Sequence, residues 1–180
     1  PEIGPELAEK MGEEDIDTLK SRMKTEVEAR YNGRAQTEAR DTLRTELGNQ
    51  YDFEVPPSLL KSSLEDQRKS LIQDAMRDGK SADEAQSEVN ATIGDEEVNV
   101  VRDIRAYLVI DSVARQEKIE VTEEDMRNEL QNIMSTMGPY AQQILQMYRT
   151  PERRAELMRK IRHDKVLDFL LAQANVTTVE

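Results

Sequence analysis

The chain has 180 residues and a formal net charge of −12, from 37 acidic and 25 basic residues. Phosphate backbones repel such a surface, so we do not expect direct nucleic-acid binding. No apolar run approaches the roughly 20 residues of a membrane span. The absence of cysteine excludes disulfides and fits a cytoplasmic location. Because the sequence begins with Pro1, we expect a fragment of a longer protein.

The first long element is a predicted helix from residue 16 to residue 47. Its apolar or small residues recur mostly every four positions, at Ile16, Leu19, Met23, Val27, Tyr31, Ala35, Ala39, Leu43 and Leu47. A spacing of four drifts by about 40° per step on a helix of 3.6 residues per turn, so the apolar stripe winds around the helix. We therefore expect different neighbours along its length. Asn32-Gly33 weakens the middle, leaving one long helix or two nearly collinear ones.

A first extended joint is expected near residues 51–55, after Gly48 and Asn49 end the long helix. Val55 precedes a proline, which favours extended geometry, and a helix from 58 to 77 follows. Ser81 to Glu84 forms a capping box that starts a short helix ending near Gly94. Asp95 is expected to cap the next helix. The apolar residues of that helix recur at helical spacing, at Val98, Val101, Ile104 and Leu108.

A second extended joint is expected near residues 119–121. Thr122 then starts a helix that Gly138-Pro139 interrupts, and a short helix covers 140–149. Thr150 is the predicted N-cap of the last helix, and residues 176–179 form a β-prone tail. The pattern predicts an all-α fold: an elongated multi-helix body with two short extended joints.

The chain has no cysteine and almost no histidine, two residue types on which many catalytic and metal sites depend. His163 is the single histidine, and its neighbours Arg162, Asp164 and Lys165 indicate a solvated, charged helix face. Zinc sites built from His and Cys are excluded, and no phosphate-binding glycine loop occurs. We therefore expect no catalytic residue, no metal and no cofactor, and hence no enzyme activity in this chain.

Methionine is unusually frequent, with eight residues against two phenylalanines. Five cluster in the last third, at Met126, Met134, Met137, Met147 and Met158. Methionine is flexible and polarizable, so surfaces that accept many partners use it often. The other interpretation is that these methionines simply pack the helices together, and some of them can do both.

Two similar segments mark the joints: "FEVPPSLL" (53–60) and "IEVTEEDM" (119–126). With "PEIGPELAEKMG" (1–12) and "KVLDFLLAQANV" (165–176), they resemble the C-terminal domain of bacterial trigger factor in order and spacing over essentially the whole chain. The resemblance implies a helical chaperone domain whose body carries two protruding arms. The body would be residues 1–55 and 151–180, the first arm about 56–114 and the second arm about 122–150.

The resemblance also implies a function. The domain would hold unfolded or nascent polypeptides without ATP, assisting folding and export within a ribosome-associated chaperone. Ribosome binding and prolyl isomerisation would belong to other domains of the parent protein, which are absent here. A weak homodimer is compatible with the sequence. We expect client contacts at dispersed apolar residues, namely Met134, Met137, Tyr140, Ile144, Met147 and Tyr148 on the second arm and Leu71, Ile72 and Met76 on the first.

Two alternatives remain at this stage. The chain also resembles the helical region of a periplasmic parvulin-type chaperone, although "FEVPPSLL" and "KVLDFLLAQANV" favour trigger factor. A helical scaffold that binds one defined partner is an alternative from another class. It would form one tight complex of fixed stoichiometry, whereas a chaperone would form many weak ones.

Overall fold

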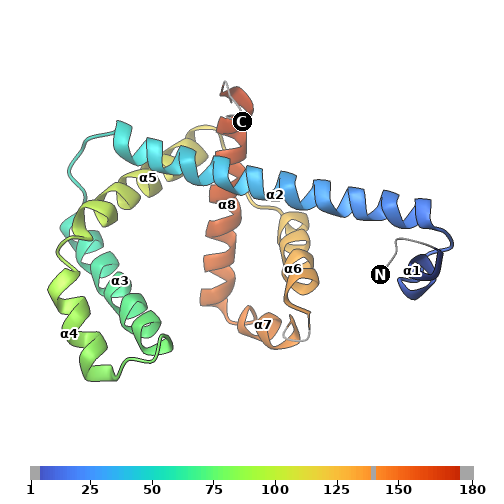
Figure 1. Cartoon of the computed structure of the whole chain (residues 1–180). Coiled ribbons are helices and arrows are strands. Elements are labelled where there is room, and N and C mark those ends of the chain that lie inside the picture. Colours follow the sequence, from blue (N-terminus) through green and yellow to red (C-terminus); the bar gives the residue numbers. More distant parts are fainter. Residues whose placement is uncertain (1–4, 139–140, 175–180) are drawn as a thin grey trace. The chain divides into compact units, whose positions relative to one another are not determined.

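The structure, a computed structural model, describes residues 5–138 and 141–174. Within these residues the chain forms eight helices and no strand (Figure 1), which confirms the all-α prediction. Pro139, Tyr140 and the predicted tail at 176–179 lie outside the described residues. Contacts divide the chain into two units, Pro1–Asp41 and Thr42–Glu180.

The first unit contains α1 (Pro5–Lys10) and most of α2 (Ile16–Gln50). Asp15 caps α2, because its Oδ1 accepts hydrogen bonds from the backbone N–H groups of Asp17 at 2.8 Å and Thr18 at 2.7 Å. The helix is unbroken through Gly33, so it is one helix rather than two. Leu19 of the predicted apolar stripe is buried, whereas apolar residues that follow it in the middle of the helix are exposed. The exposed apolar residues there are Met23, Val27 and Tyr31.

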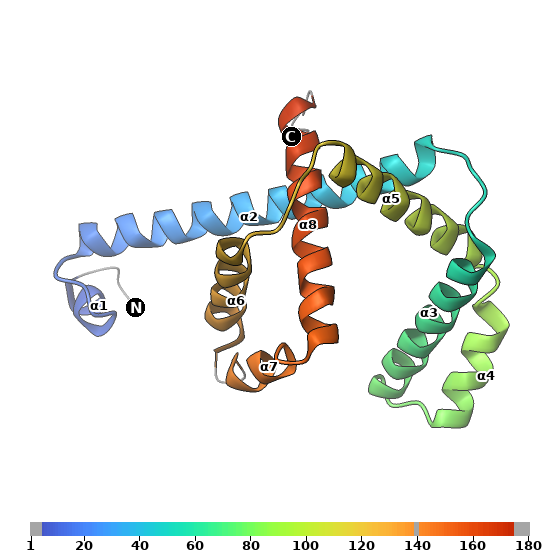
Figure 2. The same cartoon turned by 180° about the vertical axis from the view of Figure 1, so that it is seen from behind.

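The second unit contains the last turns of α2 and six further helices. These are α3 (Pro57–Arg77), α4 (Ala82–Thr92), α5 (Glu97–Gln116), α6 (Glu123–Met137), α7 (Ala141–Met147) and α8 (Pro151–Gln173). Non-helical residues 51–56 and 117–122 separate α2 from α3 and α5 from α6, so both joints lie where the sequence predicts them. In both Figure 1 and Figure 2, α3 and α4 lie side by side, and α7 links α6 to α8.

Two apolar clusters connect α2, α5, α6 and α8 within the second unit. In the first, Ile110 and Ala114 of α5 pack against Val166 and Leu167 of α8, with Leu43 and Leu47 of α2 beside them. In the second, Met126 of α6 packs against Leu157 and Ile161 of α8. Because α8 contributes to both clusters, it connects α5 to α6.

The start of α5 differs from the prediction. Asp95 is not its cap: the helix begins at Glu97, and no side chain caps it. Residues 93–97 instead continue helical turns, in which the N–H groups of Glu96 and Glu97 bond to the carbonyls of Ile93 and Gly94. Val98, expected on the apolar face, is 77% exposed, whereas Ile104 is buried as expected.

Candidate binding surfaces

Three of the predicted second-arm residues meet in one groove between α7 and α8. The groove has a volume of about 360 Å³ and includes Ile144, Met147 and Tyr148. Its α8 side is formed by Arg153, Glu156, Leu157 and Lys160. Met147 is 51% exposed, and Leu157 is buried. An apolar side chain from another molecule can therefore reach an aliphatic surface here without any rearrangement of the core.

Local sequence signals fix the α8 side of the groove. Thr150 caps α8, since its Oγ1 accepts a hydrogen bond from the Arg153 N–H at 3.4 Å, and Pro151 occupies the first turn. Arg153 pairs with Glu156 at 2.9 Å, and Lys160 pairs with Glu129 of α6 at 2.6 Å. The rim is thus polar around an apolar interior.

Lys160 stays charged at this rim. Burial lowers its pKa, but the hydrogen bond to Glu129 and the charge of Asp164 outweigh burial, so the net shift of the pKa is upward.

Of the other predicted second-arm residues, Met134 and Met137 do not line this groove. Met134 and Met137 are exposed on α6, at 48% and 44%, and Tyr140 lies outside the described residues. Tyr148 has two roles, because it also packs against the α6–α8 cluster. The methionine cluster therefore divides between core, as for Met126, and exposed surface.

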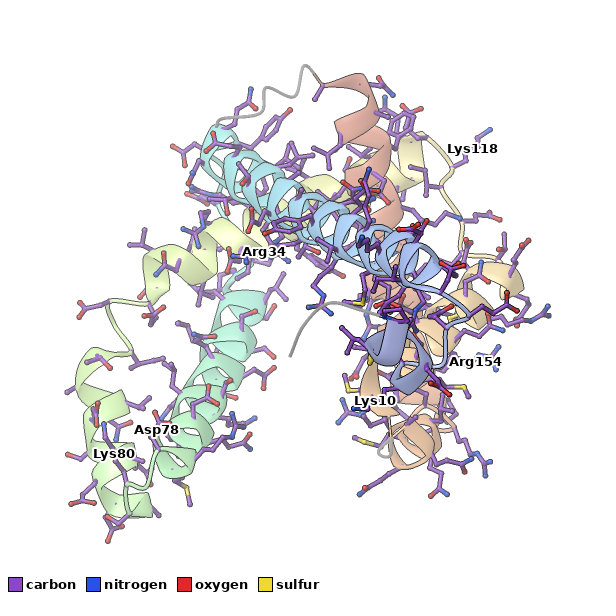
Figure 3. All side chains as sticks on the ribbon, turned by 45° about the vertical axis from the view of Figure 1, so that its right-hand side comes forward. Lys10, Arg34, Asp78, Lys80, Lys118 and Arg154 are labelled. Carbon is purple, nitrogen blue, oxygen red and sulfur yellow. The ribbon has the colours of Figure 1, made fainter. Side chains whose placement is uncertain are left out.

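The predicted first-arm residues lie on α3, away from the α7–α8 groove. Leu71 and Ile72 are half-buried, and Met76 is 47% exposed. Met76 precedes the turn of Asp78 to Lys80, which Figure 3 shows at the end of the α3–α4 pair. We treat these residues as a proposed first-arm patch, separate from the α7–α8 groove.

Sequence reasoning missed a groove between α3 and α5, with a volume of about 320 Å³. Its apolar lining is Leu59, Val100, Ile104 and Tyr107, and its polar lining is Ser63, Gln67 and Asp103. Tyr107 follows Ile104 by three positions on the helix, and that spacing was the available signal. The partner helix α3 was not predictable from α5 alone.

His163 is not on a solvated face, which corrects the sequence interpretation. It is half-buried, and its ring lies 4.9 Å from that of Tyr107. Burial lowers the His163 pKa, and the nearby Arg162 lowers it further. In the part of the chain that the structure describes, no group of three acidic or histidine side chains is arranged to hold a metal ion. No helix among the described residues is long and apolar enough to cross a membrane.

Comparison with known proteins identifies the family. Residues 15–172 match the family described as the bacterial trigger factor protein C-terminus. Trigger factor of Citrifermentans bemidjiense is 32% identical over 193 residues, covering 99% of this chain and 42% of the relative. Trigger factor of Rhodopseudomonas palustris (strain CGA009) is 31% identical over 179 residues, covering 97% of this chain and 39% of the relative.

A third relative, trigger factor of Anaeromyxobacter dehalogenans, is 28% identical over 179 residues, covering 98% of this chain and 42% of the relative. The chain thus spans about two fifths of the length of these relatives. No solved structure matches it significantly. The matches favour trigger factor over the parvulin-type alternative, and the chain belongs to the family of trigger factor C-terminal domains.

Proposed function

We propose that this chain is an ATP-independent chaperone domain that holds unfolded or nascent polypeptides through dispersed apolar patches. The observation that carries the proposal is the α7–α8 groove, where Ile144 and exposed Met147 stand inside a rim of ion pairs. Unfolded chains expose apolar side chains, and burying them gains about 25 cal/mol per Å². A flexible methionine accepts side chains of different shapes.

Several weak sites suit this task better than one tight site. The patch at Met76 on α3 and the groove at Met147 belong to different helix pairs. One client segment bound at the first patch raises the effective concentration of the next segment at the second patch. The remaining surface is rich in acids, with a net charge of −12, which keeps the chaperone dissolved while a client is bound.

The wider setting is part of the same proposal. Because the chain spans about two fifths of its relatives, other domains of the whole protein would supply ribosome binding and prolyl isomerisation. We place the whole protein in the cytoplasm, where nascent chains emerge. The two arms would then be α3 to α5 and α6 to α7.

The proposal is tested by diluting two unrelated, chemically denatured proteins into buffer with increasing amounts of the chain and no nucleotide. We expect light scattering to fall for both proteins at near-stoichiometric amounts. A folded chain that suppresses neither would contradict the proposal. One tight complex with a single partner, at fixed stoichiometry, would instead favour the scaffold alternative.

A further inference from the structure

The first joint is held by the helix that returns to it. After α2, the chain passes through residues 51–56, forms α3 and α4, and returns as α5. Arg105 of α5 donates a hydrogen bond from Nε to the carbonyl oxygen of Phe53 at 3.0 Å. Its Nη2 pairs with Asp52 Oδ1 at 2.6 Å, and only 23% of the Arg105 side chain is exposed. One guanidinium therefore binds both the backbone and a side chain of the outgoing joint.

The second joint has the same arrangement. After α5, the chain passes through residues 117–122, forms α6 and α7, and returns as α8. Lys165 of α8 donates to the carbonyl oxygen of Glu120 at 2.9 Å and to Asp125 Oδ2 at 2.6 Å. The same Asp125 oxygen accepts hydrogen bonds from the N–H and the hydroxyl of Thr122, each at 2.8 Å. The joint, the first turn of α6 and α8 are thus tied at one carboxylate.

The hydrogen bonds at the second joint strongly lower the pKa of Asp125. The hydrogen bond from Lys165 comes first among the causes that lower its pKa, to about 2, followed by those from Thr122. Asp125 is therefore ionised throughout the range in which the protein is expected to work, and the link to Lys165 persists there.

The two links fall on the segments that are similar in sequence. Phe53 and Glu120 are at neighbouring positions when Phe53-Glu54-Val55 is aligned with Ile119-Glu120-Val121. Carbonyl groups of an extended, unpaired segment have no partner within a helix or sheet. A cationic donor satisfies such a carbonyl with a bond roughly twice as strong as a neutral one.

We propose that Arg105 and Lys165 are positioning residues, each of which closes the base of one helical arm and sets the direction in which that arm leaves the body. The inference rests on the proposed function, because the arms are expected to hold clients. In each case the cation joins the extended joint at the base of the arm to the helix that returns there, so loss of the cation frees the joint.

The chain contains a matched control for ordinary surface ion pairs. Arg77 pairs with Asp74 at 2.9 Å within α3, and 76% of the Arg77 side chain is exposed. Exposed pairs of this kind contribute little to stability, and this pair connects no separate elements. Arg77→Met therefore removes a cation and an ion pair without touching a joint.

Pulsed electron paramagnetic resonance tests the inference, because it measures the distance between two spin labels attached to introduced cysteines. The sequence contains no cysteine that would have to be removed first. One spin-label pair replaces Asp78 and Ala172, and reports on the first arm. A second pair replaces Gln142 and Gln116, and reports on the second arm. We expect Arg105→Met to broaden the distance distribution of the first pair only, and Lys165→Met that of the second pair only. Arg105→Lys and Lys165→Arg should restore narrow distributions, and Arg77→Met should change neither.

Unchanged distributions in both methionine variants would overturn the inference. Broadening of both pairs by one variant, or loss of helicity measured by circular dichroism, would also overturn it, because the residue would then support the fold as a whole. Asp52→Asn removes the charge of the carboxylate but keeps the hydrogen bond from Arg105 to the Phe53 carbonyl oxygen. We expect this milder variant to broaden the distance distribution of the first spin-label pair as well. Aggregation suppression by the unlabelled wild-type chain is measured separately. Its absence would count against the proposed function and leave the distance result intact.

Discussion

Gly48 of α2 lies directly against the backbone of Arg102 on α5. A Cβ atom at Gly48 would stand 2.4 Å from the Arg102 carbonyl oxygen and 2.6 Å from its Cγ. Sequence reasoning assigned Gly48 to the end of the helix, but α2 continues to Gln50. The residue is small because two helices meet there, and a backbone atom cannot move aside as a side-chain tip can.

Gly48→Ala should therefore lower the free energy of unfolding by about 1–3 kcal/mol, the usual cost of overpacking. Gly33→Ala is the matched control, since it lies inside the same helix and no atom lies within 4 Å of its added Cβ. That change should raise stability by about 0.5–1 kcal/mol, because alanine loses less backbone entropy than glycine. Urea unfolding of the Gly48→Ala and Gly33→Ala variants measures both changes in the free energy of unfolding. Equal effects of the two substitutions would contradict the close approach.

Asp111 is the one buried acidic residue among those described, at 7% exposure. Its Oδ1 accepts a hydrogen bond from Arg162 at 2.7 Å, and its Oδ2 pairs with Arg115. The Arg162 side chain is 33% exposed and that of Arg115 is 77% exposed. Arg162→Met should lower the free energy of unfolding by about 1–3 kcal/mol, because it leaves a buried oxygen unpaired. Arg115→Met should cost less than about 1 kcal/mol. Denaturant unfolding that ranks the two variants in the opposite order would contradict this interpretation.

Lys118 lies two residues after the end of α5 and has a left-handed conformation, with φ of 53°. The Ile119 N–H reaches back to the Ala114 carbonyl at 2.9 Å, and Ile119 packs against the core cluster. Figure 3 shows Lys118 at this turn. Lys118→Gly should raise the free energy of unfolding by about 0.5–1 kcal/mol, because glycine adopts this conformation without steric cost. Lys118→Ala keeps a Cβ atom in this conformation and therefore keeps its steric cost. Thermal unfolding of the alanine variant should show no gain in stability.

The half-buried His163 predicts a dependence of stability on pH. Its folded pKa lies below the unfolded value of 6.5, first because of burial and then because of Arg162. The unfolded chain therefore binds the proton more readily. The contribution of neutral His163 is fully present above pH 6.5 and is lost as the pH falls through the folded pKa. The other charged groups around it are Asp111, Asp164 and Arg44.

His163→Gln should remove this part of the pH dependence. The urea midpoint of the wild type should fall between roughly pH 7 and pH 5 more steeply than that of the variant, since carboxylates titrate mainly below this range. As this is the single histidine, nuclear magnetic resonance of its ring protons reports the pKa directly. A folded pKa at or above that of the urea-unfolded chain would contradict the burial argument.

Local signals predicted much of the fold. Ser81 and Glu84 form the expected capping box, and Thr122 and Thr150 cap α6 and α8. These motifs satisfy backbone N–H groups within a few residues, so the sequence contains all their partners. At the C-terminus of α3, Gly79 adopts φ of 97°, a conformation that glycine favours, so this turn has a signature in the sequence. The equivalent turn after α5 uses Lys118, which has no such signature in the sequence.

What was missed depends on partners far away in the chain. The Asp52–Arg105 and Asp125–Lys165 links join residues that no local pattern relates. The candidate binding surface divides in the same way: the sequence predicted Ile144, Met147 and Tyr148 as client contacts from the clustering of methionine. The α8 side of their groove, including Leu157, required the fold.

The central claim is that apolar groups of the α7–α8 groove hold unfolded chains. The most direct measurement is a light-scattering titration that compares the wild type with the double variant Ile144→Ser, Met147→Ser. The control is Met23→Ser, Val27→Ser on α2, where the native side chains are 42% and 44% exposed. Circular dichroism establishes that each variant is folded.

We predict that the groove variant needs about ten times more protein for half-maximal suppression, which corresponds to a loss of about 1.4 kcal/mol in binding free energy. The control should behave as the wild type does. Unchanged suppression by the folded groove variant, or an equal loss in the α2 control, would contradict the account.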